Sequence, residues 1–521
     1  MSSKLEPFLE ELKKRLNQNE RFREKAAGFS GTLLFTLLPD PMFPKVLRIL
    51  FEIDRGEVRE IKVSEPSVRP TLELRLGFAT YLAVIRGNMK VGLSAVTKGK
   101  VKVVGGTFKA LRSMGMLMEI VETTKKLAEE WRGRLGAILA RCEFKSPHLI
   151  VGPNVREMLA GMGAKRAVIV TDKTMVQVGH VDEVRKWLTE GGAEVLVFDE
   201  VQPEPMVEQV EEIVKLLRRF KPQVIVGVGG GSVMDAAKAS FIRYERPDIP
   251  LERLDPSWDV IPRKARLVLV PTTSGTGSEV TWASVISTKR AGGEKVKLGL
   301  AHRELIPSYA IVDPFFVYQL PKKLVSSTGL DALAHAVEGM LCPMRNELVM
   351  ATGIRALKLI FRYLPKSYAG DREARERVHY AATLAGLTFG NSQATLCHGL
   401  GHSFGATFNV PHGWAVSVFL PYVMDYYEDS AKEVLRELAE EVGVGGVSEF
   451  RARVVKLIRE VDGYTSIAEF GIKKEDFEAK LELLVDLAKD DYCTYSGPRI
   501  PTDEELRKLY EYSYRGERVD F

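Results

Sequence analysis

Between about residues 142 and 318, the chain alternates short apolar runs with amphipathic helical stretches. The apolar runs include AVIVTDK, AEVLVFDE, VIVGVGGG and LVLVPTTSG, and helical patterns such as VDEVRKWLTEGG lie between them. An apolar run without polar alternation is typical of a strand that is buried on both faces, as in a parallel sheet covered by helices. This region is therefore predicted to form a doubly wound α/β sheet, in which ligands bind at the carboxyl ends of the strands.

The regions on either side show different patterns, and 521 residues exceed what a single core supports. The amino-terminal region combines an amphipathic helix, strands joined by a turn at Asp54-Arg55-Gly56, and an apolar helix after GKVKVVGG, which predicts an α+β domain. After about Tyr318 only helical periodicity remains. The predicted domains are residues 1–138 (α+β), 139–318 (Rossmann-like α/β) and 319–521 (all-helical).

Composition restricts the location and chemistry of the protein. No apolar run is long enough to cross a bilayer, and the charged amino terminus lacks the apolar core of a signal peptide, so we expect a cytoplasmic protein. The four cysteines show no metal-knuckle spacing, which favours free thiols. Asn and Gln total 14, against 74 basic and 69 acidic residues, a balance that favours a thermophilic protein.

Charge is distributed unevenly along the chain. Residues 1–140 carry 25 Lys and Arg but only 16 Asp and Glu, whereas the remainder carries 49 and 53. A basic domain favours anionic partners such as lipid headgroups or the phosphates of CoA, although a solvated charged surface is the simpler interpretation. We expect no nucleic-acid partner, because aromatic and basic residues are not interleaved and no nucleic-acid motif is present.

A glycine-rich turn follows one of the predicted strands. The strand Val224–Val228 leads into Gly229, Gly230, Gly231 and Ser232, and a helix follows. Glycines let backbone amides approach a phosphate closely, and Ser232 is expected to cap the helix. The next strand leads into PTTSGTGSEVT, which offers hydroxyls to the same crevice. GGGS alone is also compatible with a plain tight turn, but two such loops after successive parallel strands favour a nucleotide site.

The first strand–helix unit of this region has no G-x-G-x-x-G motif and ends in Thr171-Asp172-Lys173. An acidic side chain at a strand end suits a ribose 2′-hydroxyl and repels a 2′-phosphate, so Asp172 favours NAD over NADP. The alternative interpretation is that Asp172 only caps a helix.

The helical third contains a cluster of potential metal ligands. Asp331 and His335 are four residues apart, which places them on one helix face, and His398 and His402 share that spacing. His412 follows a break at Pro411. A lone buried histidine is usually a hydrogen-bonded core residue, but this set predicts a site for Fe²⁺ or Zn²⁺. The types of ligand do not choose between these two metals.

Residues 142–521 resemble the iron-containing (group III) alcohol dehydrogenase family. The matching motifs are TDK, FDEVQPEP, GGGSVMDAAK, PTTSGTGSEVT, IVDP, GLDALAHAVEG, HGLGHSFGATFNVPHG and CTYSGPR. The resemblance implies a dehydroquinate synthase-like fold and hydride transfer between a small alcohol or aldehyde and NAD in a homo-oligomer. It also implies these residue roles: Asp331, His335, His398 and His412 as ligands of Fe²⁺, with Zn²⁺ as the alternative; His402 as a catalytic proton relay; and Asp172, Gly229, Gly230, Gly231, Ser232, Asp235, Thr272, Thr273, Thr276 and Lys297 around the nucleotide.

The chain departs from the family pattern at three positions. The family often has Asn where this chain has Glu204, Ala283 and Gly497. The first two positions lie on the cofactor side of the predicted site, so the departures bear on cofactor affinity. The predicted metal ligands are all present.

Residues from about 10 to 130 resemble a sterol-carrier-protein-2 (SCP2-like) domain. The resemblance rests on GTLLF, the hairpin around DRGE, LELRLGFATYLAVIRGNM, and KGKVKVVGG before an apolar helix. It implies an apolar tunnel that takes a lipid or an acyl-CoA. The alternative is a packed scaffold without a ligand.

Two other functions are compatible with parts of the sequence. A lyase of the dehydroquinate-synthase type shares the fold, NAD and a metal, but that family uses a Glu and two His as ligands. A lipid- or acyl-CoA-binding protein with a non-catalytic dehydrogenase scaffold is the alternative from another class. The complete ligand set favours the dehydrogenase over both.

Overall fold

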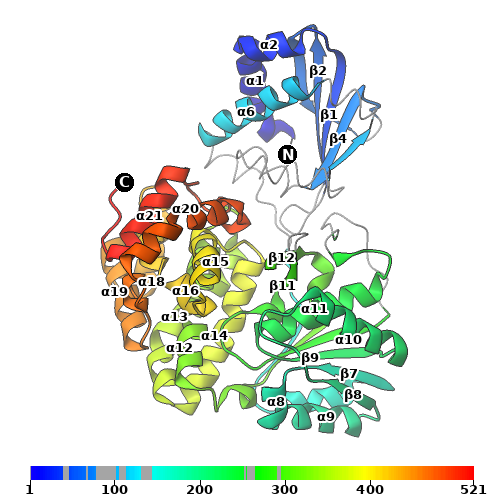
Figure 1. The fold of residues 1–521 in the computed structure, drawn as a ribbon, viewed down its shortest axis with the longest axis vertical. Helices are drawn as coiled ribbons and strands as arrows, with labels where there is room; N and C mark the ends of the chain where they lie inside the picture. Colours follow the sequence, from blue (N-terminus) through cyan, green and yellow to red (C-terminus); the bar gives the residue numbers. More distant parts are fainter. Residues whose placement is uncertain are drawn as a thin grey trace. The chain divides into compact units, whose positions relative to one another are not determined.

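The computed structural model describes residues 2–38, 46–65, 68–77, 101–104, 113–130, 144–251, 254, 264–289 and 295–521. Two compact units are present, one formed by Met1–Glu143 with Asp255–Trp258 and the other by Phe144–Leu254 with Asp259–Phe521 (Figure 1). Several sequence features fall outside the described residues, namely most of LELRLGFATYLAVIRGNM, part of KGKVKVVGG, Cys142, and the AGGE turn before Lys295.

The first unit combines helices with a mostly antiparallel sheet. Its strands lie in the order β3-β2-β1-β4-β5, and only the β1–β4 pairing is parallel within this described sheet. Arg55 and Gly56 have φ values of 47° and 86°, the left-handed pair that a two-residue hairpin requires, so the predicted turn is confirmed. The elements are α1 Ser2–Gln18, α2 Glu20–Ala26, β1 Ser30–Leu38, β2 Leu47–Asp54, β3 Glu57–Val63, β4 Leu72–Gly77, β5 Val101–Val104 and α6 Met114–Glu130.

The core of this unit lies between the helices and one sheet face. Leu5, Leu9, Leu12 and Leu16 recur at helical spacing along α1 and are all buried in this core. The central strand β1 was not predicted as a strand. Its sequence SGTLLFTLL shows no apolar–polar alternation, because Leu33 to Leu37 are buried on both faces.

The second unit contains the predicted parallel sheet. Its strands lie in the order β6-β13-β10-β9-β7-β8 and pair in parallel. The predicted strands β7, β8, β9 and β10 are confirmed, whereas β6, β13 and the antiparallel hairpin β11–β12 were missed. The elements are β6 His148–Val151, η1 Val155–Met162, β7 Arg166–Val170, α8 Lys173–Gln177, α9 His180–Glu190, β8 Glu194–Phe198, α10 Val207–Phe220, β9 Val224–Gly229, α11 Gly231–Glu245, β10 Arg266–Pro271, β11 Ala283–Lys289, β12 Lys295–Ala301 and β13 Tyr309–Val312.

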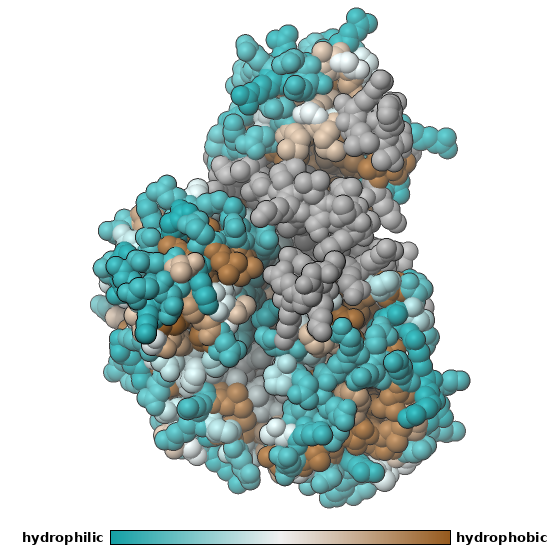
Figure 2. Space-filling model, in the orientation of Figure 1, coloured by the Kyte–Doolittle hydropathy of each residue, from teal (hydrophilic) through white to brown (hydrophobic). Residues whose placement is uncertain are grey.

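Beyond β13 the described chain is helical, as predicted. The elements are α12 Lys322–Leu341, α13 Glu347–Ala369, α14 Arg372–Gly390, α15 Leu396–Phe408, α16 His412–Ser417, α17 Leu420–Tyr426, α18 Lys432–Glu441, α19 Val447–Glu460, α20 Lys474–Asp490, η7 Tyr492–Tyr495 and α21 Asp503–Arg515. On the side of the molecule that Figure 2 shows, the surface of these helices is mostly hydrophilic, with some hydrophobic areas. Among the described residues, no helix is long and apolar enough to span a membrane.

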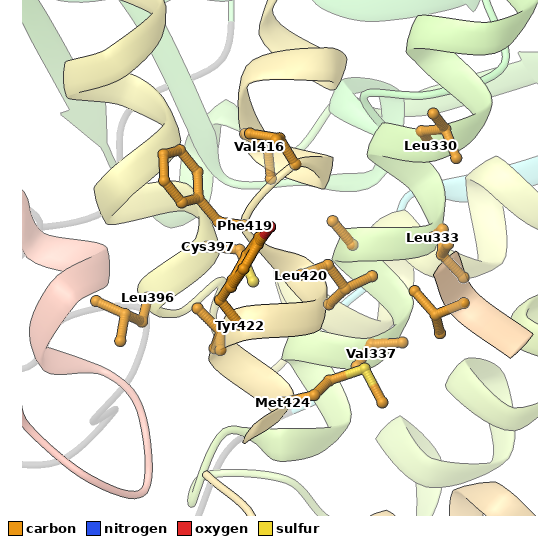
Figure 3. Packing of buried hydrophobic residues seen from close by; sticks show 14 of the residues in the cluster. Leu330, Leu333, Val337, Leu396, Cys397, Val416, Phe419, Leu420, Tyr422 and Met424 are labelled. Atoms are coloured by element: carbon orange, nitrogen blue, oxygen red, sulfur yellow. The ribbon is translucent and has the colours of Figure 1, made fainter. Parts of the chain in front are cut away.

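Helix α12 lies in the middle of the helical core. Leu330, Leu333 and Val337 share one face of it and belong to the same buried cluster as Val416 of α16 and Leu420 of α17 (Figure 3). These residues are completely buried. The neighbouring face of α12 carries the polar residues described below, so the helix is buried on both of these faces.

Helix α14 packs against the loop that follows β10, and a buried histidine lies at this contact. His379 is 1% exposed, and its Nδ1 lies 3.2 Å from the hydroxyl of Ser274. Burial lowers the pKa of His379 to about 4. His379 therefore becomes protonated below about pH 6.5 in the unfolded chain, but only below about pH 4 in the folded chain.

We expect the folded protein to lose stability as the pH falls through this window, by up to about 3 kcal/mol from this histidine. Thermal unfolding of wild type and His379→Gln at pH 7 and pH 4.5 tests this. The drop in Tm between the two pH values should be smaller in the variant. Equal drops would show that His379 does not contribute.

Candidate metal and nucleotide site

Helices α12, α15 and α16 bring the predicted metal ligands together. Asp331 and His335 lie on α12, His398 lies on α15, and His412 is the first residue of α16. Ligand atoms of Asp331, His335 and His398 all lie within 4.8 Å of one another. These three side chains are 2%, 4% and 3% exposed, so the cluster is buried.

Glycines let these elements approach closely, which explains their frequency around the histidines. A Cβ atom on Gly399 would lie 2.1 Å from the Thr494 hydroxyl, and one on Gly413 would lie 1.9 Å from the carbonyl oxygen of Ser327. Although glycine disfavours helices, α15 runs unbroken through Gly399, Gly401 and Gly405. Tertiary contacts therefore override local propensity here.

The distances within the cluster suit a shared cation. The Nε2 atoms of His335 and His398 are 2.9 Å apart, and Asp331 Oδ1 lies 3.8 Å from His398 Nε2. His412 Nε2 lies 3.4 Å from the same Asp331 oxygen, although the His412 side chain is 42% exposed. The structure thus brings all four predicted ligands together, three buried and one at the open side.

Within the described protein, the polar atoms of this cluster do not all find hydrogen-bond partners, which fits a bound metal ion. Asp331 Oδ1 is buried without a hydrogen-bond partner among the described residues. Burial raises the pKa of Asp331 to about 7, and burial lowers the pKa of His335 well below its usual value. A carboxylate and neutral imidazoles are the ligands that Fe²⁺ and Zn²⁺ prefer, so the residues fit such an ion.

Glu338, which was not predicted as a site residue, lies next to the cluster on α12. Glu338 is completely buried and faces the Nδ1 atom of His398. Burial raises the pKa of a carboxyl group, but the neighbouring His398, Thr395 and Cys397 outweigh it and the net pKa of Glu338 is lowered. Its position seven residues after Asp331 was the signal that could have revealed it.

His402 lies beside the cluster and has its own carboxylate partner. Its Nδ1 is 2.7 Å from Asp491 Oδ2, and its ring stacks on that of His412 with centroids 5.3 Å apart. Asp491 also accepts a hydrogen bond from the backbone N–H of Cys493. Neither Asp491 nor Cys493 was predicted, because both lie at the start of η7, directly after α20 and far away in sequence.

The glycine turn after β9 differs from expectation at its helix cap. Helix α11 begins at Gly231 with Gly230 at the cap position, so Ser232 lies inside the first turn and does not cap the helix. The prediction for Ser232 as a cap was wrong, because the helix begins two residues earlier than a cap at position 232 would place it. The first-turn amides have no side-chain cap, which suits an anion.

The two predicted nucleotide loops meet. Gly230 and Gly231 face the second loop so closely that added Cβ atoms would lie 3.3 Å from Thr273 Cγ2 and 2.9 Å from Thr276 Cγ2. The hydroxyls of Thr272 and Thr273 are buried without a hydrogen-bond partner among the described residues. Unpaired hydroxyls beside uncapped helix amides fit a phosphate group.

Asp235 holds the second loop in place. Its carboxylate accepts hydrogen bonds from the Ser278 hydroxyl and the Val285 backbone N–H, both at 2.9 Å. The completely buried Lys238, one turn further along α11, donates to the carbonyl oxygens of Thr281 and Ala283. Both Asp235 oxygens are therefore already engaged by the protein.

The remaining predicted cofactor residues lie after the carboxyl end of β7 and in the β11–β12 hairpin. Asp172 caps α8 by accepting a hydrogen bond from Met175 N–H at 3.0 Å, so this side chain does cap a helix. Only one of its two carboxylate oxygens makes that bond. Lys297 lies on β12, is 43% exposed, and its Nζ lies 4.0 Å from Glu204 Oε1.

One departure from the family pattern has a structural reason. A Cβ atom on Gly497 would lie only 1.9 Å from the hydroxyl oxygen of Tyr427. Tyr427 is completely buried. An asparagine at position 497 would therefore displace this tyrosine. The buried position of Tyr427 thus requires a glycine at position 497.

The second loop also touches the metal-ligand helix. A Cβ atom on Gly275 would lie 2.5 Å from Thr328 Cβ, and Thr328 precedes Asp331 by one turn of α12. The predicted nucleotide loop and the metal cluster are thus neighbours within one unit.

Comparisons with known proteins match the same region. Residues 147–314 match the model of the iron-containing alcohol dehydrogenases, and residues 325–514 match the C-terminal model of that family. The chain is 35% identical over 379 residues to the NADPH-dependent butanol dehydrogenase of Clostridium saccharobutylicum, covering 71% of this chain and 97% of that protein. It is 33% identical to the NAD-dependent methanol dehydrogenase of Bacillus methanolicus, covering 70% of this chain and 98% of that protein.

A solved structure shows the same fold. The iron-containing alcohol dehydrogenase from Thermococcus thioreducens superposes with a TM-score of 0.68 at 33% identity, covering 72% of this chain and all of that chain. Sequence identity, family models and fold thus agree on the region that contains both loops and the metal cluster. The chain belongs to the iron-containing alcohol dehydrogenase family.

Proposed function

We propose that this protein is a metal-dependent, NAD(P)-linked alcohol dehydrogenase that also reduces aldehydes. The observation that carries the proposal is the contact between the nucleotide loop and the metal-ligand helix at Gly275 and Thr328. This contact supports the proposal, because the loop that we infer to bind phosphate lies beside the buried Asp–His cluster. Hydride transfer to a nicotinamide requires both sites to meet at one substrate.

Each site residue has a role in this proposal. Asp331, His335, His398 and His412 would hold Fe²⁺ or Zn²⁺, which supplies Lewis-acid chemistry that lowers the pKa of an alcohol. NAD(P) supplies the hydride acceptor. His402 takes the released proton, because Asp491 holds its Nδ1 and leaves Nε2 for the substrate side. Burial of Asp331 and His398 keeps water from competing at the inner side.

The test is metal analysis of anaerobically purified protein, combined with NAD⁺ reduction on alcohols from ethanol to decanol. About one Fe or Zn per chain and alcohol-dependent NADH formation are expected. Protein without metal and without turnover, even after Fe²⁺ or Zn²⁺ is added, would overturn the proposal. The alternative of an inactive dehydrogenase scaffold is not supported, because the relatives are dehydrogenases.

We further propose NAD as the preferred nucleotide, because Asp172 ends β7 with one carboxylate oxygen unused by its cap. Replacing Asp172 with Ser keeps a capping oxygen and removes the charge. The ratio of kcat/KM for NADP⁺ to that for NAD⁺ should rise about tenfold or more, since like charges in contact cost several kcal/mol. Asp172→Asn serves as a second neutral variant. An unchanged ratio in both variants would contradict the assignment.

For the first unit we propose an apolar ligand such as an acyl chain. A small cavity of about 20 Å³ lies between α1, α6 and the sheet, lined by Phe8, Leu9, Leu12, Phe35, Ile49, Phe51, Ile120, Val121 and Thr124. This space holds about one water molecule, so an acyl chain requires the helices to part. Titration of the full chain with palmitoyl-CoA should show saturable binding that Val121→Phe weakens. Absent binding, or equal binding in both proteins, would leave the unit as a scaffold.

A further inference from the structure

Both carboxylate oxygens of the buried Glu338 make polar contacts. Its Oε1 accepts hydrogen bonds from Thr395 N–H at 3.0 Å, the Thr395 hydroxyl at 2.8 Å and Cys397 N–H at 2.8 Å. Its Oε2 faces His398 Nδ1. One carboxylate therefore ties α12 to the first turn of α15, which carries a predicted metal ligand.

We propose that Glu338 is a positioning residue that fixes the tautomer and orientation of His398 for metal binding. Because Oε2 accepts the proton on Nδ1, Nε2 carries a lone pair and points at the cluster, 2.9 Å from His335 Nε2. A carboxylate behind a ligating histidine also makes that histidine a better donor. This inference rests on the proposed function, since it assumes that the Asp–His cluster holds a metal.

The charges in the site support the same role. With neutral imidazoles, Asp331 offers one negative charge to a divalent cation in a buried environment. Glu338 is completely buried and supplies a second negative charge immediately behind His398. The two carboxylates together therefore balance a divalent ion, and the buried site becomes neutral when it is loaded.

Donors face both oxygens of Glu338, which makes Glu338→Gln a specific test. Glu338 accepts at both oxygens, from Thr395 and Cys397 on one side and from His398 on the other. A glutamine with its amide NH₂ toward His398 would donate to Nδ1 and force the proton onto Nε2, which blocks ligation. The opposite orientation would point the NH₂ at the donors of Thr395 and Cys397. Either orientation penalises metal binding.

The experiment titrates Co²⁺ and Zn²⁺ into the metal-free full chain and follows the Co²⁺ absorption spectrum. Glu338→Gln should weaken metal binding by about 10- to 100-fold. Thr395→Val is the matched control, because it removes one hydrogen bond to Oε1 of Glu338 but keeps the charge and the contact between Oε2 and His398. Its metal affinity should stay within about threefold of wild type, since a single hydrogen bond has a small net effect. Glu338→Asp keeps the charge and should recover part of the loss.

The outcomes separate the two proposals. Wild-type protein that binds neither metal overturns the proposed function and this inference with it. Wild-type protein that binds metal while Glu338→Gln binds it equally well overturns the inference alone, as does a Thr395→Val loss as large as that of Glu338→Gln. If Glu338→Gln does not fold, Glu338→Asp takes its place, since its carboxylate is one methylene short of His398. Wild-type affinity in Glu338→Asp would then overturn the inference.

Discussion

Replacing Asp331 with asparagine is expected to remove the bound metal and lower kcat by about 10³-fold, the equivalent of several kcal/mol of Lewis-acid stabilisation. Asp331 lies at the centre of the cluster, with His398 and His412 facing its Oδ1 and His335 facing its Oδ2 at 3.9 Å. The amide has the same shape but no charge, so the helix is kept while the anionic ligand is lost. Metal content and steady-state kinetics measure the effect.

The same substitution should stabilise the metal-free protein. Because burial raises the pKa of Asp331 to about 7, the folded metal-free chain binds a proton that the unfolded chain releases near pH 4. Metal-free wild type therefore loses stability as the pH rises from about 4 to 7, whereas metal-free Asp331→Asn does not. At pH 7 the variant should have the higher Tm when both proteins lack metal.

Asp425→Asn is the matched control for this experiment. Asp425 is another buried carboxylate of the helical part, but it pairs with Arg451 and Arg518. Its replacement should lower Tm and leave metal content unchanged. An Asp331→Asn protein with a full complement of metal and kcat within tenfold of wild type would rule out Asp331 as a ligand.

Gly413→Ala is expected to lower kcat by about 100-fold, because a displacement of about 1 Å near a reacting centre has effects of that size. Its Cβ would lie 1.9 Å from Ser327 O and 2.6 Å from Ser327 C, both backbone atoms of α12. Backbone cannot rotate away, so α16 must move. His412 is the residue before Gly413 and would move away from Asp331.

The loss of stability from this overpacking should be about 1–3 kcal/mol, so the protein should still fold. The Kd for Co²⁺ and kcat measure the displacement of His412, and thermal unfolding measures the packing cost. Gly161→Ala is the control, since a Cβ there would meet nothing within 4 Å. Wild-type Kd and kcat in Gly413→Ala would show that His412 does not depend on this contact.

Periodicity in the sequence was sufficient for the strands β7 to β10 and for the helical third. Buried parallel strands must be apolar throughout, so their sequences differ visibly from the amphipathic helices between them. The strands β6 and β13 were missed because four residues each, HLIV and YAIV, are too few for a period to show. They pair in the sheet only because neighbours from other parts of the chain are present.

The metal ligands were predictable for a similar reason. Asp331 and His335 share a helix, so their spacing of four residues already sets their separation in space. The partners of His398 and His402 were not predictable in this way. Glu338 and Asp491 lie 60 and 89 residues away from these histidines. Nothing local in the sequence records that they meet.

The sequence by itself determined the order of the elements, the apolar faces that bury them and the residues able to bind a metal. These are local properties, because they depend on side-chain chemistry and on helix or strand periodicity. Only the tertiary structure decided that Ser232 lies inside its helix, that Asp235 is engaged by the second loop, and that Glu338 lies behind His398. Those outcomes depend on which distant segments approach closely, and close packing at positions such as Gly413 controls that approach.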